Sequence, residues 1–243
     1  MPDQPWRDLA DELTSTLGLD VAPLAITFSA EPPPGVPAYG GERPEPTADG
    51  RTGPVAAGCV FWMEGVERTF TTVAEDHANC SVGSLTHGFL TLEEAATKAD
   101  VEEILGCGWV SMDAVPRIPV VKEKPGAVTF GPLADTPVDP DVVFLRLDGR
   151  QLMVFSDAVP GLQVEGKPQC HIVALAKDHD TVALSAGCAL SRVRTGMPDS
   201  QVTCAIPAGR VAEVVAALRA NAHADDVVRR YAAEDAARFT PSG

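Results

Sequence analysis

Apolar residues recur at three- and four-residue intervals in several stretches of the chain, which is the spacing of one helix face. Helices are predicted at residues 4–18, 92–105 and 151–159, from residue 168, from residue 207, and over the last 20 residues. Thr91 is a suitable cap for the second helix. Pro168 would open the fourth and place Cys170 in its first turn, where helix amides favour a thiolate.

Short runs of β-branched and apolar residues separate these helices. Strands are predicted at residues 23–29, 69–73, 118–121, 127–130, 141–147, 181–185 and 201–206. The run Asp141–Leu147 is the strongest, and Asp148 and Gly149 close it. Because helices and strands alternate, we predict one α/β or α+β domain over residues 1–243, with a mixed sheet flanked by helices.

Residues 31–54 interrupt this pattern with seven prolines and five glycines. Such a stretch predicts a long loop, either a cover over a site or a connector. The first interpretation is favoured because the loop leads directly to Cys59.

Composition narrows the classes of function. A net charge of −15 argues against binding to nucleic acid or to an anionic membrane surface. The first nine residues lack the apolar core of a signal peptide, so a cytoplasmic protein is expected. Its six cysteines are then expected to be thiols, metal ligands or nucleophiles rather than disulfides. The acidic surface and apolar helices permit a homodimer without arguing for one.

Residues 75–89 concentrate the side chains that can carry chemistry. This stretch holds His77, Asn79, Cys80, Gly83 and His87. Thiol and imidazole groups are soft or borderline metal ligands, and glycine allows the backbone to approach a bound group closely. The stretch therefore predicts the centre of a metal or cluster site.

Two more cysteines occur among similarly small residues and are predicted to join this site. They are Cys59, which follows Gly58, and Cys188, which follows Gly187. No Cys-x-x-Cys pair is present, so the fold would have to bring these thiols together. The alternative is that the cysteines only fill the core, where free cysteine is common.

Histidine and arginine residues near the cysteines are candidates for catalysis. His77 and His87 flank Cys80 and could move protons, although either could be a satisfied core histidine. Arg192 and Arg194 follow Cys188 and could hold a substrate anion, or form an ordinary surface pair. His171 could polarise Cys170, but an exposed helix position is the favoured interpretation for it.

Four pieces of the chain resemble the domain of unknown function 169 family, the uncharacterised ArCR proteins. They are the first helix with residues 17–28, Cys59, the segment 79–89, and the pieces 168–170, 185–192 and 205–207. The resemblance implies that the cysteine site is formed by Cys59, Cys80, Cys170 and Cys188. It implies that Cys107 and Cys204 are core thiols. Some family members carry a further cysteine where this chain has Ser191. The resemblance implies no established reaction.

The leading hypothesis is therefore a 4Fe–4S enzyme acting on a small, sulfur-containing or anionic substrate, as a lyase or in sulfur transfer. Cys59, Cys80 and Cys188 would hold the cluster, with Cys170 as fourth ligand or free thiol. Asn79, Gly83 and Gly187 would shape the cofactor site, while His77, His87 and Arg192 would act on the substrate. The alternatives are a haem or mononuclear-metal protein and a non-enzymatic metal or redox sensor.

Overall fold

A single mixed sheet organises the computed structural model, which describes residues 5–41 and 57–239. Its strands are β1 (Leu24–Ser29), β2 (Phe70–Thr72), β3 (Ala127–Pro132), β4 (Val142–Leu147), β5 (Gln163–Glu165), β6 (Ala183–Ser185) and β7 (Val202–Pro207). Their order across the sheet is β2-β3-β1-β4-β7-β6-β5. All neighbours are antiparallel except β5 and β6, which are parallel. The predicted single α/β domain with a mixed sheet is confirmed.

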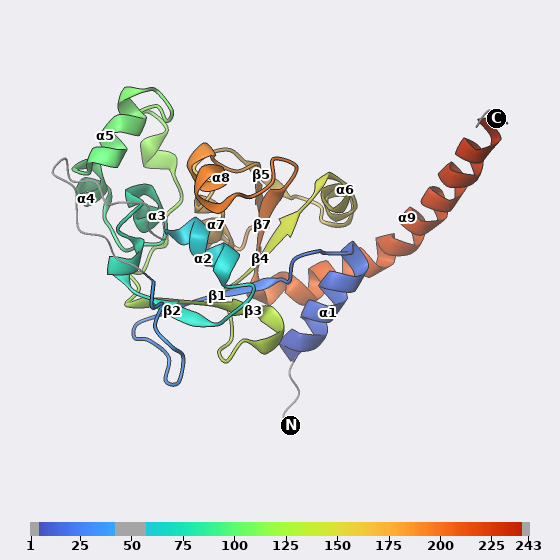
Figure 1. Ribbon diagram of the computed structural model, residues 1–243, viewed down its shortest axis with the longest axis horizontal. Coiled ribbons are helices and arrows are strands. Elements are labelled where there is room, and N and C mark those ends of the chain that lie inside the picture. Colours follow the sequence, from blue (N-terminus) through green and yellow to red (C-terminus); the bar gives the residue numbers. More distant parts are fainter. Residues whose placement is uncertain (1–4, 42–56, 240–243) are drawn as a thin grey trace.

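Helices pack on both faces of this sheet (Figure 1). In the described part they are α1 (Pro5–Leu17), α2 (Gly58–Glu64), α3 (Ser81–Thr86), α4 (Leu92–Ala96), α5 (Ala99–Gly106), α6 (Gly149–Ala158), α7 (His171–His179), α8 (Ala189–Thr195) and α9 (Val211–Phe239). Short 3₁₀ turns lie at Ala74–His77, Val115–Arg117, Leu133–Asp135 and Ala208–Arg210. None of the described helices is long and apolar enough to cross a membrane.

The strands alternate between two hydrophobic cores because successive side chains point to opposite faces. On β4, Val143 and Leu145 pack with α1, α6 and the first turns of α9, whereas Val142 and Phe144 pack with α2 and α7. The first core is mostly aliphatic, with Phe155 as its buried aromatic residue. The second is rich in aromatic rings, and it supports the helices that carry the cysteines.

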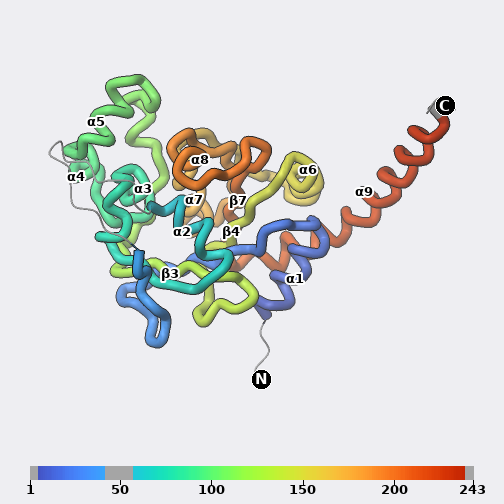
Figure 2. The backbone as a smooth tube through the Cα atoms, viewed as in Figure 1, coloured from blue at the N-terminus to red at the C-terminus, as the bar shows by residue number. Residues whose placement is uncertain are grey.

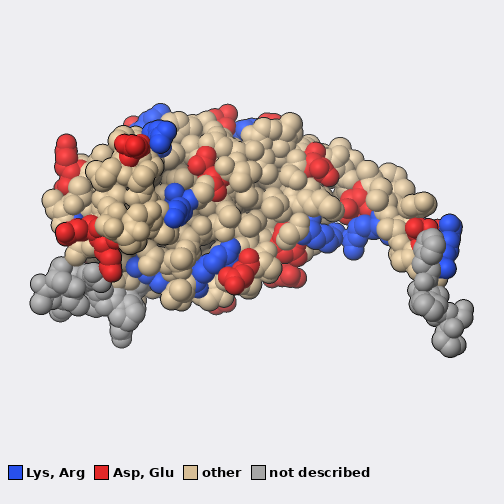
Figure 3. Space-filling view, turned by 90° about the horizontal axis from the view of Figure 1, so that it is seen from above, with Lys and Arg blue, Asp and Glu red and all other residues tan. Residues whose placement is uncertain are grey.

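The last helix begins in the first core and then leaves the body of the molecule (Figures 1 and 2). Val211, Val214, Val215 and Leu218 are buried, as the helical pattern predicts. Beyond them, Val227, Val228 and Tyr231 are exposed. The charged terminal helix is thus the outer half of α9 rather than a separate element. Figure 3 shows acidic and basic side chains interspersed over the face that it presents.

Two predicted elements differ from the structure. The helix predicted over residues 92–105 is two helices, because Thr97 donates its hydroxyl to the Glu94 carbonyl and the chain becomes extended at Lys98. The strand predicted at residues 118–121 does not join the sheet. Val121 donates its N–H to the carbonyl of Thr86 instead, and Pro119 has no N–H to give.

Other predicted elements agree with the structure or lie partly outside it. The capping box of Thr91 and Glu94 begins α4 as expected. Of the loop predicted over residues 31–54, only 31–41 are described, and there Ala38 forms an isolated bridge with Thr71. The sequence pattern did not predict the helices α2, α3 and α8 or the short edge strand β5. Each is brief, and none shows a full period of its pattern.

Candidate metal centre

Four cysteines far apart in the sequence line one pocket on the aromatic-core side of the sheet. We call it the cysteine pocket. Its lining comprises Ala57, Gly58, Cys59, Trp62, Cys80, Val82, Gly83, Trp109, Pro168, Gln169, Cys170, Cys188, Leu190, Ser191 and Arg194. Cys59, Cys80, Cys170 and Cys188 are the four thiols that the resemblance singled out, and all six cysteines are free. No imidazole or carboxylate belongs to this lining.

Each of these cysteines stands where a helix begins. Cys80, Cys170 and Cys188 are the capping residues of α3, α7 and α8, and Cys59 is the second residue of α2. The sulfur of Cys188 accepts a hydrogen bond from the Ser191 amide at 3.3 Å. Helix beginnings present backbone N–H groups, which stabilise negative charge on sulfur.

Burial keeps most of these thiols protonated. It raises the pKa of Cys59 to about 11, and the nearby Cys80 adds to the increase. Burial also raises the pKa of Cys170 well above its usual value, so the thiolate expected at this helix start is not favoured in the metal-free protein. The pKa of Cys188 is raised for the same reason, although the Ser191 amide opposes the change. A metal would therefore have to displace protons to bind here.

Arg194 is the cation that lines the cysteine pocket. The sequence pattern had predicted that Arg192 would hold the substrate. Burial alone would lower the pKa of Arg194, but negative charge on Cys80, Cys59 and Cys188 reverses the effect and raises it. Leu190, Ser191 and Arg194 face the pocket at helical spacing on α8. That spacing was the signal in the sequence that could have identified Arg194.

Arg192 points elsewhere and holds a loop together. Its guanidinium donates to the carbonyl oxygens of Pro198 at 2.6 Å, Ala186 at 2.7 Å and Gln201 at 2.8 Å. An arginine with this many backbone partners has little capacity left to bind a substrate anion. The residue therefore has a structural position, and the pocket lies on the other side of α8.

His77 and His87 lie behind the cysteine pocket, in the aromatic core. Both are buried, and their ring centres are 5.5 Å apart. Burial lowers the pKa of His87 to about 4 and that of His77 well below its usual value, so both are neutral near pH 7. His87 Nδ1 lies 2.9 Å from the carbonyl of Gly83. Neither ring lines the cysteine pocket, and a part in proton transfer stays a prediction.

Gly83, Gly187 and Asn79, which were expected to shape the cofactor site, each lie next to one of the residues that line the cysteine pocket. A Cβ on Gly83 would lie 3.5 Å from the sulfur of Cys80, an ordinary contact. Gly187 has a φ of +102°, which a residue with a side chain rarely adopts, and it precedes Cys188. The N–H of Cys188 donates to Gln169 Oε1 at 3.2 Å. Asn79 is 8% exposed, and its backbone oxygen accepts a hydrogen bond from Arg194.

The remaining thiols and His171 only partly match expectation. Cys204 is buried in the aliphatic core as predicted, whereas Cys107 is exposed at the end of α5 because that helix buries none of its residues. His171 is buried rather than exposed, and its Nε2 lies 3.1 Å from a carboxylate oxygen of Glu165. Its burial follows from the position of α7 beneath the sheet.

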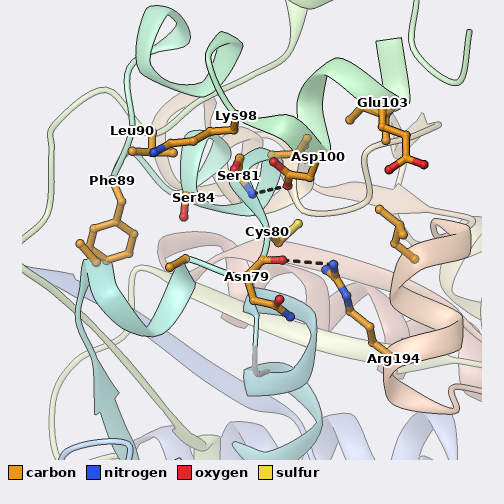
Figure 4. A pocket seen from close by; sticks show the side chains of 15 residues that line it. Asn79, Cys80, Ser81, Ser84, Phe89, Leu90, Lys98, Asp100, Glu103 and Arg194 are labelled. Atoms are coloured by element: carbon orange, nitrogen blue, oxygen red, sulfur yellow. Dashed lines mark hydrogen bonds between the residues drawn. The ribbon is translucent and has the colours of Figure 1, made fainter. Parts of the chain in front are cut away.

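A second, larger pocket adjoins the cysteine pocket. It measures about 390 Å³ and lies between α3, α5 and α8 (Figure 4). The two pockets share Cys80, Val82, Leu190 and Arg194. Among the four clustered cysteines, only Cys80 lines both. In the described residues, no three His, Cys, Asp or Glu side chains form a group that could hold one metal ion as they stand.

Comparison with known proteins gives one match. The family described as uncharacterised ArCR, DUF169, matches residues 12–217. No curated protein and no solved structure matches the chain. The family match spans all seven strands and the four clustered cysteines. This chain belongs to the DUF169 family.

Proposed function

We propose that this protein binds an iron–sulfur cluster of the 4Fe–4S type in the cysteine pocket and acts on a small substrate in the adjoining pocket. The observation that carries the proposal is the meeting of Cys59, Cys80, Cys170 and Cys188, from four separate helices, around one buried space. Four cysteine thiolates are the usual ligand set of such clusters.

The donor set supports a cluster more than a single ion. A structural zinc site brings four ligands to one point at about 2.3 Å from the ion. The described residues contain no group that converges in this way, although the four thiols are near enough to affect one another's charge. In a 4Fe–4S cluster each thiolate binds a different iron, so the sulfurs surround the group instead of meeting at a point.

The charges of the site suit an anionic group. A cluster held by four thiolates is negative, and Arg194 places a positive charge among the same sulfurs. The amide of Ser191 already donates to the sulfur of Cys188. Hydrogen bonds to the sulfurs and nearby charge are two means by which a protein stabilises and tunes such a cluster.

Loading the site requires its wall to move. The free space in the cysteine pocket is about 30 Å³, which corresponds to about one water molecule. Among the helices that line the pocket, the short helix α8 buries the fewest residues. It buries only Ser191, and it is bounded by Gly187 and Gly196, both with positive φ. We infer that α8 shifts outward when the cluster is bound.

The chemistry would occur where the two pockets meet. With Cys170 as a free thiol, the other three cysteines would hold the cluster, and the iron left without a protein ligand would supply a Lewis acid for sulfur or oxygen of a substrate, as lyases and sulfur-transfer enzymes require. Cys80 and Arg194 are the groups of the cluster site that reach the larger pocket. Arg194 would orient an anionic substrate there, and the apolar wall would exclude water.

Reconstitution with ferrous iron and sulfide under anaerobic conditions tests the ligand set. The proposal predicts that the reconstituted wild type shows broad absorption in the blue–violet. Each pocket cysteine is then replaced in turn (C59S, C80S, C170S, C188S). The absorption should be weakened or lost in C59S, C80S and C188S, and also in C170S if Cys170 is the fourth ligand. Exposed Cys107→Ser is the matched control and should keep the spectrum. Equal spectra in all five variants would contradict the proposed ligands.

A further inference from the structure

The larger pocket carries chemistry of its own, apart from the thiols. Its lining comprises Ala74, Ala78, Asn79, Cys80, Ser81, Val82, Ser84, Phe89, Leu90, Lys98, Asp100, Glu103, Ile104, Leu190 and Arg194. We call it the Arg194 pocket, and Figure 4 shows side chains that line it, among them Ser81 of α3, Asp100 of α5 and Arg194 of α8. A volume of about 390 Å³ lies within the range of small-molecule sites.

Arg194 is incompletely bonded in this pocket. Its Nη2 donates to the Asn79 carbonyl at 3.1 Å (Figure 4). Its Nη1 is buried and has no hydrogen-bond partner among the described residues. A buried cationic donor without a partner costs free energy that a suitable acceptor would recover. The unpartnered Nη1 of Arg194, a residue that lines this pocket, therefore marks a place for an anionic acceptor.

The acidic groups of the pocket restrict the charge of that ligand. Asp100 already accepts the amide N–H of Ser81 at 2.9 Å, and Glu103 lies on the same helix, α5. Two carboxylates on one wall would repel a polyanion such as a phosphate ester. One positive side chain, Lys98, stands on the same side at the start of α5. This balance favours a ligand with a single negative charge.

The rest of the wall is apolar. Phe89, Leu90, Ile104 and Leu190 line it, together with two alanines and Val82. Such a wall binds the hydrocarbon part of a small molecule by removing it from water. The planar guanidinium of arginine matches a carboxylate with two parallel hydrogen bonds.

We propose that the Arg194 pocket binds a small organic monocarboxylate, with its carboxylate on Arg194 and its hydrocarbon part along the apolar wall next to Cys80. As an assignment of substrate class this deepens the proposed function and rests on it. Binding of the carboxylate itself requires no cluster. It uses residues that line the pocket in the structure.

Butyrate and its uncharged analogue butyramide are the probes. Saturation-transfer NMR titration on the full chain, metal-free, should show saturable butyrate binding, with butyramide at least tenfold weaker. Arg194→Gln should weaken butyrate at least tenfold, whereas Arg194→Lys should restore part of the affinity. Arg229→Gln, on the projecting part of α9, is the matched control and should bind as the wild type does.

A second variant keeps the test valid if Arg194→Gln does not fold. Ile104→Glu leaves Arg194 in place and adds a negative charge to the wall, so it should also weaken butyrate at least tenfold. Equal binding of butyrate and butyramide, or unchanged butyrate binding in Arg194→Gln or in Ile104→Glu, would overturn the inference. If butyrate binds and no iron can be incorporated, the proposed function fails while this inference stands. If iron is incorporated and butyrate does not bind, the carboxylate site is ruled out while the proposed function stands.

Discussion

His87 Nδ1 lies 2.9 Å from the carbonyl oxygen of Gly83, three residues beyond Cys80, while its Nε2 is buried without a hydrogen-bond partner in the described structure. The ring contacts the place where a Cβ on Gly58 would lie, with Cε1 at 3.2 Å. One neutral imidazole thus supports the backbone beside two of the clustered cysteines. The consequence is that the cysteine pocket depends on a histidine that must not be charged.

Lowering the pH from about 6.5 toward 4 should therefore destabilise the fold. In the unfolded chain a histidine binds a proton below about pH 6.5, whereas burial lowers the folded pKa of His87 to about 4. Between these values the unfolded state holds more protons, so stability is complete above pH 6.5 and declines as pH falls toward 4. His87 alone should account for about 3 kcal/mol of this loss. Urea unfolding at pH 7.5, 6, 5 and 4.5 measures it.

His87→Gln should reduce this pH dependence because glutamine does not titrate, while His77, whose pKa is also lowered by burial, keeps its own share. His179→Gln is the control, since His179 is exposed, and it should retain the wild-type slope. A His87→Gln profile as steep as that of the wild type would show that other groups cause the acid loss.

Arg192 should matter for stability and not for ligand binding. Arg192→Gln removes charged hydrogen bonds to the carbonyls of Ala186, Pro198 and Gln201, which should cost about 2–3 kcal/mol. For a chain of this size that corresponds to a fall in melting temperature of roughly 4–12 °C. Calorimetry measures the change. A stable Arg192→Gln that no longer binds butyrate would return the ligand role to Arg192.

Gly187 should tolerate no side chain. Its φ is +102°, and an added Cβ would lie 3.1 Å from Gln169 Oε1 and 3.2 Å from Arg192 Nη2. Gly187→Ala should therefore destabilise the fold by roughly 1–3 kcal/mol. Gly149→Ala is the matched control, because a Cβ there meets no atom within 4 Å. Equal melting temperatures for the two variants would contradict the strain argument.

Loading of metal should release protons. Because burial raises the pKa of Cys59, Cys170 and Cys188, these thiols are protonated at pH 7.5 in the metal-free protein. Anaerobic loading with iron and sulfide in a weak buffer should release close to one proton for each of these cysteines in addition to the protons that hydrosulfide loses on entering the cluster, and apparent affinity should rise with pH. Cys204→Ala is the control, because it removes a thiol outside the pocket and leaves the pocket thiols intact. A proton release well below one per pocket cysteine in this variant would contradict the assignment of these cysteines as ligands.

Much of the fold could be read from residue patterns. The apolar and β-branched runs of β1 and β4 and the helical spacing at the start of α9 are strong local signals, and the structure contains all of them. The break between α4 and α5 could not be predicted, since it depends on Thr97 bonding back to Glu94 rather than on apolar spacing. The sheet order also depends on pairing between distant segments.

The candidate site shows the same division. The cysteines could be chosen from their small neighbours and the family resemblance, and they do line one pocket. Choosing between Arg192 and Arg194 required knowing that residues 189–195 form a helix, because only then do the two side chains point in different directions. The burial of His171 depends on packing between α7 and the sheet, which no local pattern of charge indicates.

The most direct measurement is iron and acid-labile sulfide analysis, with an absorption spectrum, of protein purified without oxygen, for the wild type and Cys80→Ala. The account predicts iron and sulfide in near-equal amounts in the wild type and their loss in Cys80→Ala. A colourless wild type that contains no iron, before and after reconstitution, would contradict it.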